Sequence, residues 1–149
     1  MELDRFLESW DRVRAVTVKA AAAMPEAEAD FRPVPEVFSF RELLAHIMGA
    51  EQVFVGGVTA DRWDRPPADG APPDIPALLE RMEKLHADSK ARLAGLDQAA
   101  LGQVVKAPFG VGLPRMGFLW LLRDHEVHHR GQMYTYLRLK GVTPPFFAG

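Results

Sequence analysis

The chain has 149 residues, of which 48% are hydrophobic and 26% are charged, and none is cysteine. This length suits one domain, and the absence of cysteine excludes disulfide bonds and thiolate metal sites. The formal net charge of −2 comes from scattered acidic and basic residues, which argues against nucleic-acid binding. The N-terminus lacks the basic start and apolar run of a signal peptide, and no uninterrupted apolar run reaches membrane-spanning length. We therefore expect a single cytoplasmic domain over residues 1–149.

The first two predicted helices are marked by apolar periodicity and by a capping signal. Residues 3–23 carry a broad apolar stripe followed by a run of alanines, and a connector interrupted by prolines comes next. A second helix is predicted to start after Ser39, because Ser39 and Glu42 have the spacing of a capping box. The pair Gly56 and Gly57 is expected to end this helix or to lie close to its end.

A proline-rich loop separates the second predicted helix from the third. The composition of residues 61–74 excludes regular structure, and loops of this length are often functional or mobile. The third helix is predicted to begin after the N-cap Asp74, with Pro76 in its first turn, and to end at Gly95. The apolar, glycine-rich residues 101–112 are expected to form a loop or a short hairpin.

The fourth predicted helix runs from about Pro114 to Lys140. Gly141 is a natural stop for it, and two prolines lie just beyond. No strand-like alternation of useful length is present in the sequence. Four helices joined by connectors predict an all-α fold, a four-helix bundle.

The sequence DHEVHHRGQMY at residues 124–134 contains the H-E-x-x-H pattern of zinc proteases. Such enzymes need a third protein ligand, commonly from downstream, but no acidic residue follows Glu126 and no histidine follows His129. The extended form of the pattern also fails, because Gln132 and Thr135 occupy the positions of its glycine and last histidine. Peptide substrates of these enzymes usually pair with a sheet edge, and no sheet is predicted. A protease is therefore not expected.

Helical spacing places two histidines on one apolar face of the last helix. At about 100° per residue, His125 and His129 lie one turn apart on this face, with Glu126 beside it. Two imidazoles at this spacing can hold one ion, and a third ligand must then come from another helix. His46 in the second helix also faces inward, whereas His86 lies in a charged stretch and is expected at the surface. Spacing alone leaves a metal site and hydrogen-bonded core histidines as alternatives.

Three stretches resemble the DinB/YfiT-like superfamily of metal-binding four-helix bundles, and together they span nearly the whole chain. They are the helix pattern of residues 1–24, FRPVPEVFSFRELLAHIMGAEQ, and HEVHHRGQMYTYLRLKGVTPP. The last is the most specific, because H-x-x-x-H-R-G-Q followed by a tyrosine-rich helix end and G-V-x-P-P is typical of this family. The resemblance implies a divalent ion, zinc or nickel, held by His46, His125 and His129.

The resemblance also limits the reactions to consider. Relatives with an assigned activity include thiol transferases that use bacillithiol or mycothiol and a mycothiol-dependent isomerase, and a few members are described as metal-dependent hydrolases. Three protein ligands would leave an open position for a small-molecule substrate. We therefore expect a metal-dependent enzyme, with thiol S-transfer first and hydrolysis second. The alternatives are a non-catalytic metal-binding or stress-related protein and a structural bundle without metal. Because the chain has no cysteine, any thiol must come from a cosubstrate.

Four more residues near the motif have expected positions. Gln132 is expected to orient a ligand or a bound water, and Tyr136 to line the pocket or donate a proton, with packing as the alternative for both. Glu126 is the candidate catalytic base or hydrogen-bond partner of a histidine, with a solvated helix face as the alternative. Arg130 points away from the histidines and is expected at the surface or in an interface.

A second apolar stripe lies on the back of the last helix. Trp120, Val127 and Tyr134 recur every seven residues on the side opposite the histidines. A helix that is apolar on two sides is either fully buried or packed against a partner. We therefore expect this stripe to contribute to a homodimer, or else to be covered by one of the long loops.

Overall fold

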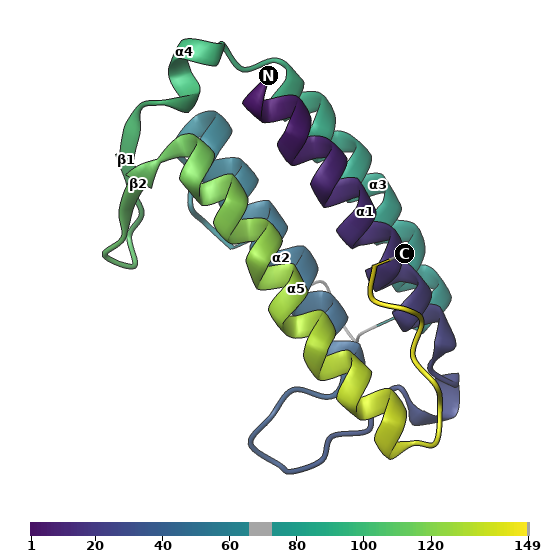
Figure 1. Ribbon diagram of the computed structural model, residues 1–149. Helices are drawn as coiled ribbons and strands as arrows, with labels where there is room; N and C mark the ends of the chain where they lie inside the picture. The colour runs from purple at the N-terminus through teal and green to yellow at the C-terminus, as the bar shows by residue number, and fades with distance from the viewer. Residues whose placement is uncertain (66–72, 149) are drawn as a thin grey trace.

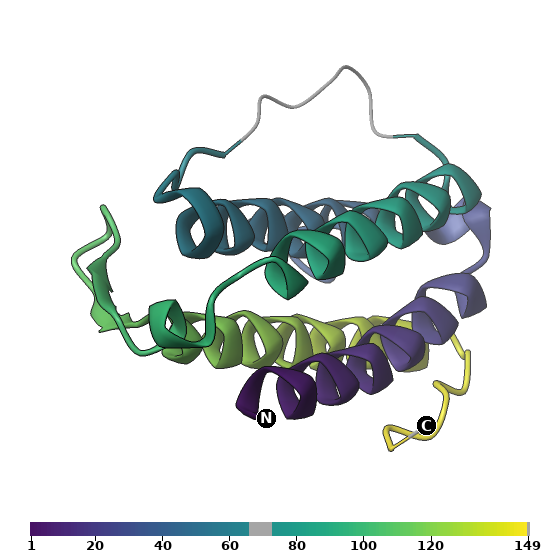
Figure 2. The same ribbon diagram turned by 90° about the horizontal axis from the view of Figure 1, so that it is seen from above.

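Four long helices make up most of the fold, and the computed structural model describes residues 1–65 and 73–148. The helices are α1 (Glu2–Ala23), α2 (Phe40–Ala60), α3 (Ile75–Ala94) and α5 (Arg115–Leu139). They pack in two layers, with α2 beside α3 in one layer and α1 beside α5 in the other (Figures 1 and 2). The predicted all-α four-helix bundle is therefore confirmed.

The predicted signals at the helix ends are present in the structure. Ser39 Oγ accepts a hydrogen bond from the backbone N–H of Glu42, and the Glu42 carboxylate accepts one from the N–H of Ser39, which confirms the capping box. Asp74 caps the first turn of α3, and Gly95 ends that helix. Gly141 adopts the left-handed conformation, at φ 73°, just beyond α5.

The end of α2 differs in detail from its prediction. The helix continues past Gly56 and Gly57 to Ala60, and Asp61 then ends it in the left-handed conformation at φ 55°. The chain turns back along α2, and a Cβ on Gly57 would lie 2.3 Å from the ring of Trp63. The glycines therefore leave room for the returning chain instead of terminating the helix. Residues 66–72 of the proline-rich loop lie outside the described residues.

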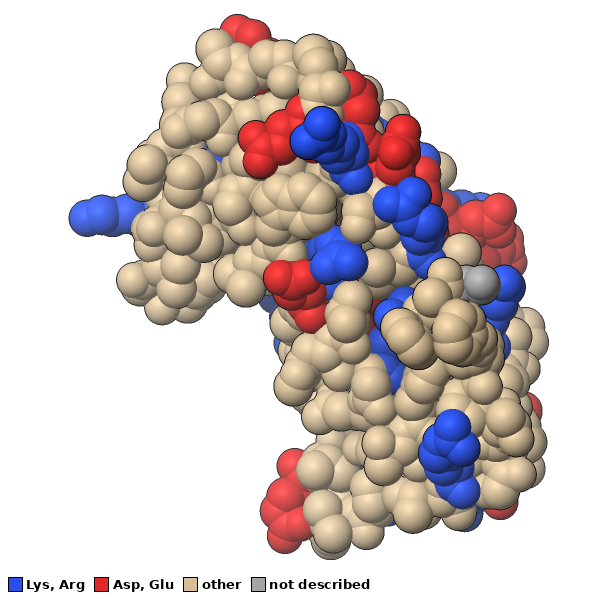
Figure 3. Space-filling model, viewed as in Figure 1, with Lys and Arg blue, Asp and Glu red and all other residues tan. Residues whose placement is uncertain are grey.

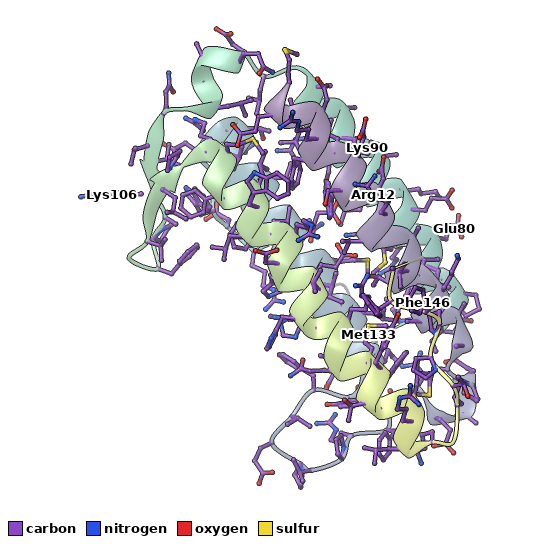
Figure 4. All side chains as sticks on the ribbon, viewed as in Figure 1. Arg12, Glu80, Lys90, Lys106, Met133 and Phe146 are labelled. Carbon is purple, nitrogen blue, oxygen red and sulfur yellow. The ribbon has the colours of Figure 1, made fainter. Side chains whose placement is uncertain are left out.

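The remaining elements are short. They are the 3-10 turn η1 (Glu26–Glu28), helix α4 (Gln98–Leu101) and strands β1 (Val104–Lys106) and β2 (Gly112–Pro114). The two strands pair antiparallel, with Val104 opposite Pro114, so residues 101–112 contribute to a short hairpin, one of the two predicted forms. Lys106 extends from this hairpin away from the bundle (Figure 4). Strands of three residues are too short to produce a recognisable alternation in the sequence.

The hydrophobic core consists of two clusters, one toward each end of the bundle. The cluster near the connector between α1 and α2 includes Phe40, Leu44, Met82 and Met133. The cluster near the hairpin includes Phe6, Trp10, Val55, Leu93 and Phe118. Along each of the four helices, a buried polar residue lies between the members of the two clusters: Arg14, Glu51, Ser89 and Glu126.

Three of these polar residues form a buried ion network. Arg14 of α1 donates to Glu51 of α2 at 2.7 Å and to both oxygens of Glu126 of α5 at 2.9 Å, and none of the three side chains is more than 5% exposed. Trp10 Nε1 donates to Glu126 at 3.0 Å. Burial opposes ionisation of Glu126, but the charge and hydrogen bonds of Arg14 outweigh it and lower the pKa of Glu126. At Glu51 burial outweighs the charge and hydrogen bond of Arg14, and the pKa of Glu51 is raised.

Helix α2 is long and apolar enough, by length and composition alone, to cross a membrane. In the bundle it packs against both α3 and α5. It also carries two charged residues, Arg41 and Glu51, that are buried by the fold. We attribute its hydropathy to its position as a core helix that is covered on more than one side.

Candidate metal centre

Three histidines from two helices bring one nitrogen each to a common point. His125 Nε2 on α5 lies 3.1 Å from His129 Nε2, one turn later, and 3.1 Å from His46 Nε2 on α2. The ligand atoms of all three lie within 4.8 Å of one another. In a tetrahedral zinc site with bonds of about 2.05 Å, neighbouring ligand atoms are about 3.3 Å apart, so small shifts would admit an ion. The three residues fit a divalent metal in both chemistry and spacing.

The hydrogen bond of His129 determines which of its nitrogens faces the centre. Its Nδ1 lies 2.7 Å from Oε1 of Gln132, which can only accept, so Nδ1 carries the proton and Nε2 presents its lone pair. Gln132 thus orients a histidine of the cluster, a role that differs from the expected contact with a ligand or water. His125 Nδ1 is buried and has no hydrogen-bond partner among the described residues.

Replacing Gln132 by leucine is expected to weaken metal binding about 10- to 100-fold, because loss of a partner that fixes the tautomer of a ligand typically has this effect. Competition with a chromophoric chelator would measure the dissociation constant. Thr135→Val changes an exposed residue one turn further along α5 and should leave the affinity unchanged. An unchanged dissociation constant in Gln132→Leu would contradict this role.

The three imidazoles resist protonation in the metal-free fold. Burial lowers the pKa of each, and at His125 burial together with the neighbouring rings of His129 and His46 lowers the pKa to about 4. An unfolded histidine has a pKa of about 6.5, so between about pH 4 and 6.5 the unfolded chain binds more protons than the folded one. The stability of the metal-free protein is therefore expected to fall as the pH is lowered through this window.

Urea unfolding of the metal-free protein at pH 7 and pH 5 would measure this loss. His125 should account for about 1–2 kcal/mol of the loss in unfolding free energy between pH 7 and pH 5. This is less than the full shift of its pKa implies, because the ring is only partly buried. His125→Gln should reduce the difference between the two pH values, whereas substitution of the exposed His128 by glutamine should not. The same pH dependence in wild type and His125→Gln would refute the prediction.

A pocket of about 180 Å³ opens beside His129. Its lining comes from the connector before α2, from α2 and from α5: Glu36, Val37, Phe38, Leu43, His129, Gln132 and Tyr136. Tyr136 donates its hydroxyl proton to the carbonyl oxygen of Phe38 at 2.8 Å, which ties the connector to α5. Glu36 gives this pocket an exposed carboxylate. The helical periodicity that located the histidines could not identify Glu36, because it lies outside any helix.

Glu126 lies with the buried ion network and not with the histidines. Its side chain is 1% exposed and accepts hydrogen bonds from Trp10 and Arg14. The alternative of a solvated helix face is therefore wrong. An offset of about 100° from His125 around α5 turns Glu126 toward α1, which supplies the compensating charge.

Two expectations about the surface were wrong. Arg130 is 8% exposed and donates to the carbonyl oxygen of Val13 on α1 at 3.2 Å. The His86 side chain is 12% exposed, and its Nε2 lies 2.7 Å from Oδ1 of Asp11. Its ring packs edge-on against that of Trp10, with ring centroids 4.3 Å apart. Both side chains find their polar partners on another helix, and the spacing along their own helix does not reveal such partners.

Two residues that the sequence analysis did not identify contact His46. The ring of Phe38 stacks on that of His46, with centroids 4.8 Å apart, and Arg65 Nη2 lies 3.3 Å from His46 Nδ1. Both residues lie in connecting segments, where helical periodicity makes no prediction. The one signal for Arg65 was the length of its loop, which is typical of functional segments.

Comparison with known proteins identifies relatives that match most of the chain. A family model described as the DinB superfamily matches residues 9–133. The uncharacterized protein YjoA of Bacillus subtilis (strain 168) is 24% identical over 138 residues, which cover 90% of this chain and 88% of YjoA. The crystal structure of YjoA, a DinB-like protein, superposes with a TM-score of 0.81 at 20% identity and covers 97% of this chain and 98% of its own.

Two further solved structures share the fold and have descriptions that name a function. YfiT from Bacillus subtilis, described as a probable metal-dependent hydrolase with an unusual four-helix bundle topology, matches with a TM-score of 0.74 at 18% identity, over 95% of this chain and 89% of YfiT. A mycothiol-dependent maleylpyruvate isomerase matches with a TM-score of 0.60 at 16% identity, over 88% of this chain and 60% of the isomerase. At these identities the likeness establishes the fold alone.

Proposed function

The chain belongs to the DinB superfamily, and on this basis we propose that it is a metal-dependent enzyme that acts on a small molecule at the three-histidine centre. The observation that carries the proposal is the convergence of three Nε2 atoms from α2 and α5. Three imidazole ligands leave at least one coordination position free, which is typical of catalytic and not of structural sites. Imidazole is a ligand for both zinc and nickel, so both metals are candidates.

We propose thiol S-transfer as the reaction. A bound zinc or nickel ion would supply a Lewis acid that favours the deprotonated form of a coordinated thiol or water. A thiol cosubstrate therefore needs no base from this chain, and the buried Glu126, which is held by Arg14 and Trp10, supplies none. The mycothiol dependence of the structurally similar isomerase agrees with the use of a thiol cosubstrate.

Hydrolysis is the second candidate, and Glu36 is the observation that favours it. A hydrolase needs a base near the reacting water. Glu36 lines the pocket beside His129 and is exposed, so it could accept a proton there. The description of YfiT as a probable metal-dependent hydrolase agrees with this alternative. A non-catalytic metal-binding or stress-related role is the third candidate.

One set of assays separates these candidates. Protein loaded with zinc or nickel would be tested with low-molecular-weight thiols and a chlorodinitrobenzene electrophile, and separately with a nitrophenyl ester. If the reaction is thiol transfer, the loaded protein should consume free thiol. Glu36→Gln should consume it at the same rate, and His125→Ala should not consume it. Hydrolysis predicts ester cleavage that both substitutions reduce, Glu36→Gln by about 100-fold or more. No turnover in either assay by the fully loaded protein would favour the non-catalytic role.

We also propose that the chain is cytoplasmic and forms a homodimer through the back of α5. Trp120 packs edge-on against Phe6 of α1 at 5.5 Å, yet Trp120, Val127 and Tyr134 each remain partly exposed. On the face shown in Figure 3, Lys and Arg are interspersed with Asp and Glu, and we propose no nucleic-acid partner.

Size-exclusion chromatography with light scattering at micromolar concentration is expected to give a dimer. Val127→Glu places a charge in the centre of the stripe and should shift the protein to a monomer without unfolding it, because Val127 is only partly buried. Circular dichroism would check that the fold is retained. A monomeric wild-type protein would argue against the homodimer.

A further inference from the structure

Arg65 reaches the histidine cluster because the chain returns along α2. Residues 62–65 run back beside that helix, over positions where α2 has no side chain. A Cβ on Gly57 would lie 2.3 Å from the ring of Trp63, and a Cβ on Gly49 would lie 2.7 Å from Arg65 Nη2. The glycines of α2 therefore accommodate both side chains.

The contact between Arg65 and His46 is incompatible with a loaded centre. A guanidinium group only donates, so the contact of 3.3 Å requires His46 Nδ1 to act as an acceptor. Coordination through His46 Nε2 places the imidazole proton on Nδ1, which can then only donate. Arg65 must therefore release His46 when an ion is bound, and its guanidinium becomes available one imidazole ring away from that ion.

A guanidinium next to a divalent cation calls for an anion between them. The one side-chain hydrogen bond that Arg65 forms with a described residue is the contact with His46. Two positive groups near each other repel, and a negative group held between them would be attracted by both. The planar fork of arginine matches a carboxylate in geometry, and one guanidinium balances one negative charge.

A group of aromatic rings lies beside the cluster on the hairpin side. It consists of the exposed Phe109, the partly exposed Phe54 and Trp63, and the buried Phe118, with all ring centroids 4.7–6.4 Å apart. The ring of Phe54 lies 6.5 Å from that of His125, and Phe109 is 53% exposed. A substrate bound at the ion could therefore place an apolar body against these rings.

We propose that Arg65 binds the carboxylate of the substrate and that this centre takes carboxylic acids with an apolar or aromatic body. The inference rests on the proposed function, because it requires an ion held by the three histidines. Arg65 would position the substrate, with the carboxylate between guanidinium and ion and the apolar body against Phe54 and Phe109.

Calorimetric titration of the zinc-loaded chain with phenylacetate and with its neutral isostere, phenylacetamide, tests this inference. Arg65→Gln is expected to weaken phenylacetate binding about 10- to 100-fold, the typical effect of losing a charged hydrogen bond, and to leave phenylacetamide unaffected. Arg65→Lys should restore part of the affinity. Arg62→Gln removes a neighbouring exposed arginine of the same segment and should have no effect on either titration.

The metal content of each sample distinguishes a failure of the proposed metal centre from a failure of the proposed role of Arg65. Arg65→Gln should hold as much zinc as the wild type, since Arg65 must leave His46 when the ion binds. Zinc lost from Arg65→Gln would overturn the inference, because Arg65 would then support the ligand instead of the substrate. Phenylacetate bound equally by loaded wild type and Arg65→Gln, or by neither, would overturn the inference alone. A wild-type chain that binds no zinc would overturn the proposed function itself.

Discussion

His125→Ala is expected to abolish stoichiometric metal binding. His125 is the central ligand, since its Nε2 lies 3.1 Å from the Nε2 atoms of both other histidines. Without it, two imidazoles from different helices remain, and such a pair binds a divalent ion weakly. We expect about one ion per wild-type chain and less than about 0.1 in the variant. The affinity should fall by more than the 10- to 100-fold typical of losing an outer partner of a ligand. Mass spectrometry of untagged protein would measure the metal content.

Two companion variants make the experiment specific. His46→Ala removes the ligand on α2 and should lose the metal as completely as His125→Ala, because the site needs both helices. His128→Ala removes an exposed histidine from the same helix and should retain the metal. Retention of about one ion per chain by both His46→Ala and His125→Ala would show that these histidines are core residues. The enzyme proposal would then fall with the site.

Arg14→Leu is expected to lower the free energy of unfolding by about 3–5 kcal/mol, the usual cost of leaving a buried charge without its partner. Arg14 is the cation that pairs with both Glu51 and Glu126 in the described part of the core, and both carboxylates are almost fully buried. Its loss would leave two acidic groups facing each other without compensation. Urea unfolding of the metal-free protein at pH 7 would measure the change, and the melting temperature should fall by about 10 °C.

A matched surface variant and a triple variant show whether the stability loss in Arg14→Leu comes from unpaired buried charges or from lost packing. Arg12 is exposed on the same helix (Figure 4), and Arg12→Leu should change the stability by less than about 0.5 kcal/mol. Combining Arg14→Leu with Glu51→Leu and Glu126→Leu removes all three charges and should recover much of the lost stability. A change below about 1 kcal/mol in Arg14→Leu would mean that the network is not the main polar stabilisation of the core.

The fold could be predicted because its signals are local. A capping box at Ser39, an N-cap at Asp74 and apolar periodicity along each helix depend on residues within a few positions of one another. The same holds for His125 and His129, which share a helix face because they are four residues apart. His46 was predicted to face inward from a second helix, and the family resemblance implied that all three histidines are metal ligands.

The partners of the buried charges could not be predicted in this way. Spacing along α5 placed Glu126 beside the histidine face, as a candidate base or histidine partner, and it could not show that Arg14 and Trp10 would meet Glu126 from α1. The expectations of Arg130 at the surface or in an interface, and of His86 at the surface, missed their contacts with α1 for the same reason. A charged side chain is tolerated inside only when another element supplies its partner, and the packing of the bundle determines that element.

The sequence by itself determined four helices, the capped starts of α2 and α3 and the three histidines that converge, because each depends on residues close together in one helix or on a family pattern. Only the tertiary structure decided what surrounds those histidines. Arg65 lies beside His46, and Glu36 lines the pocket beside His129, because connecting segments fold back onto the helices there. Such contacts join residues far apart in the sequence that share no periodicity, and the packed fold alone brings them together.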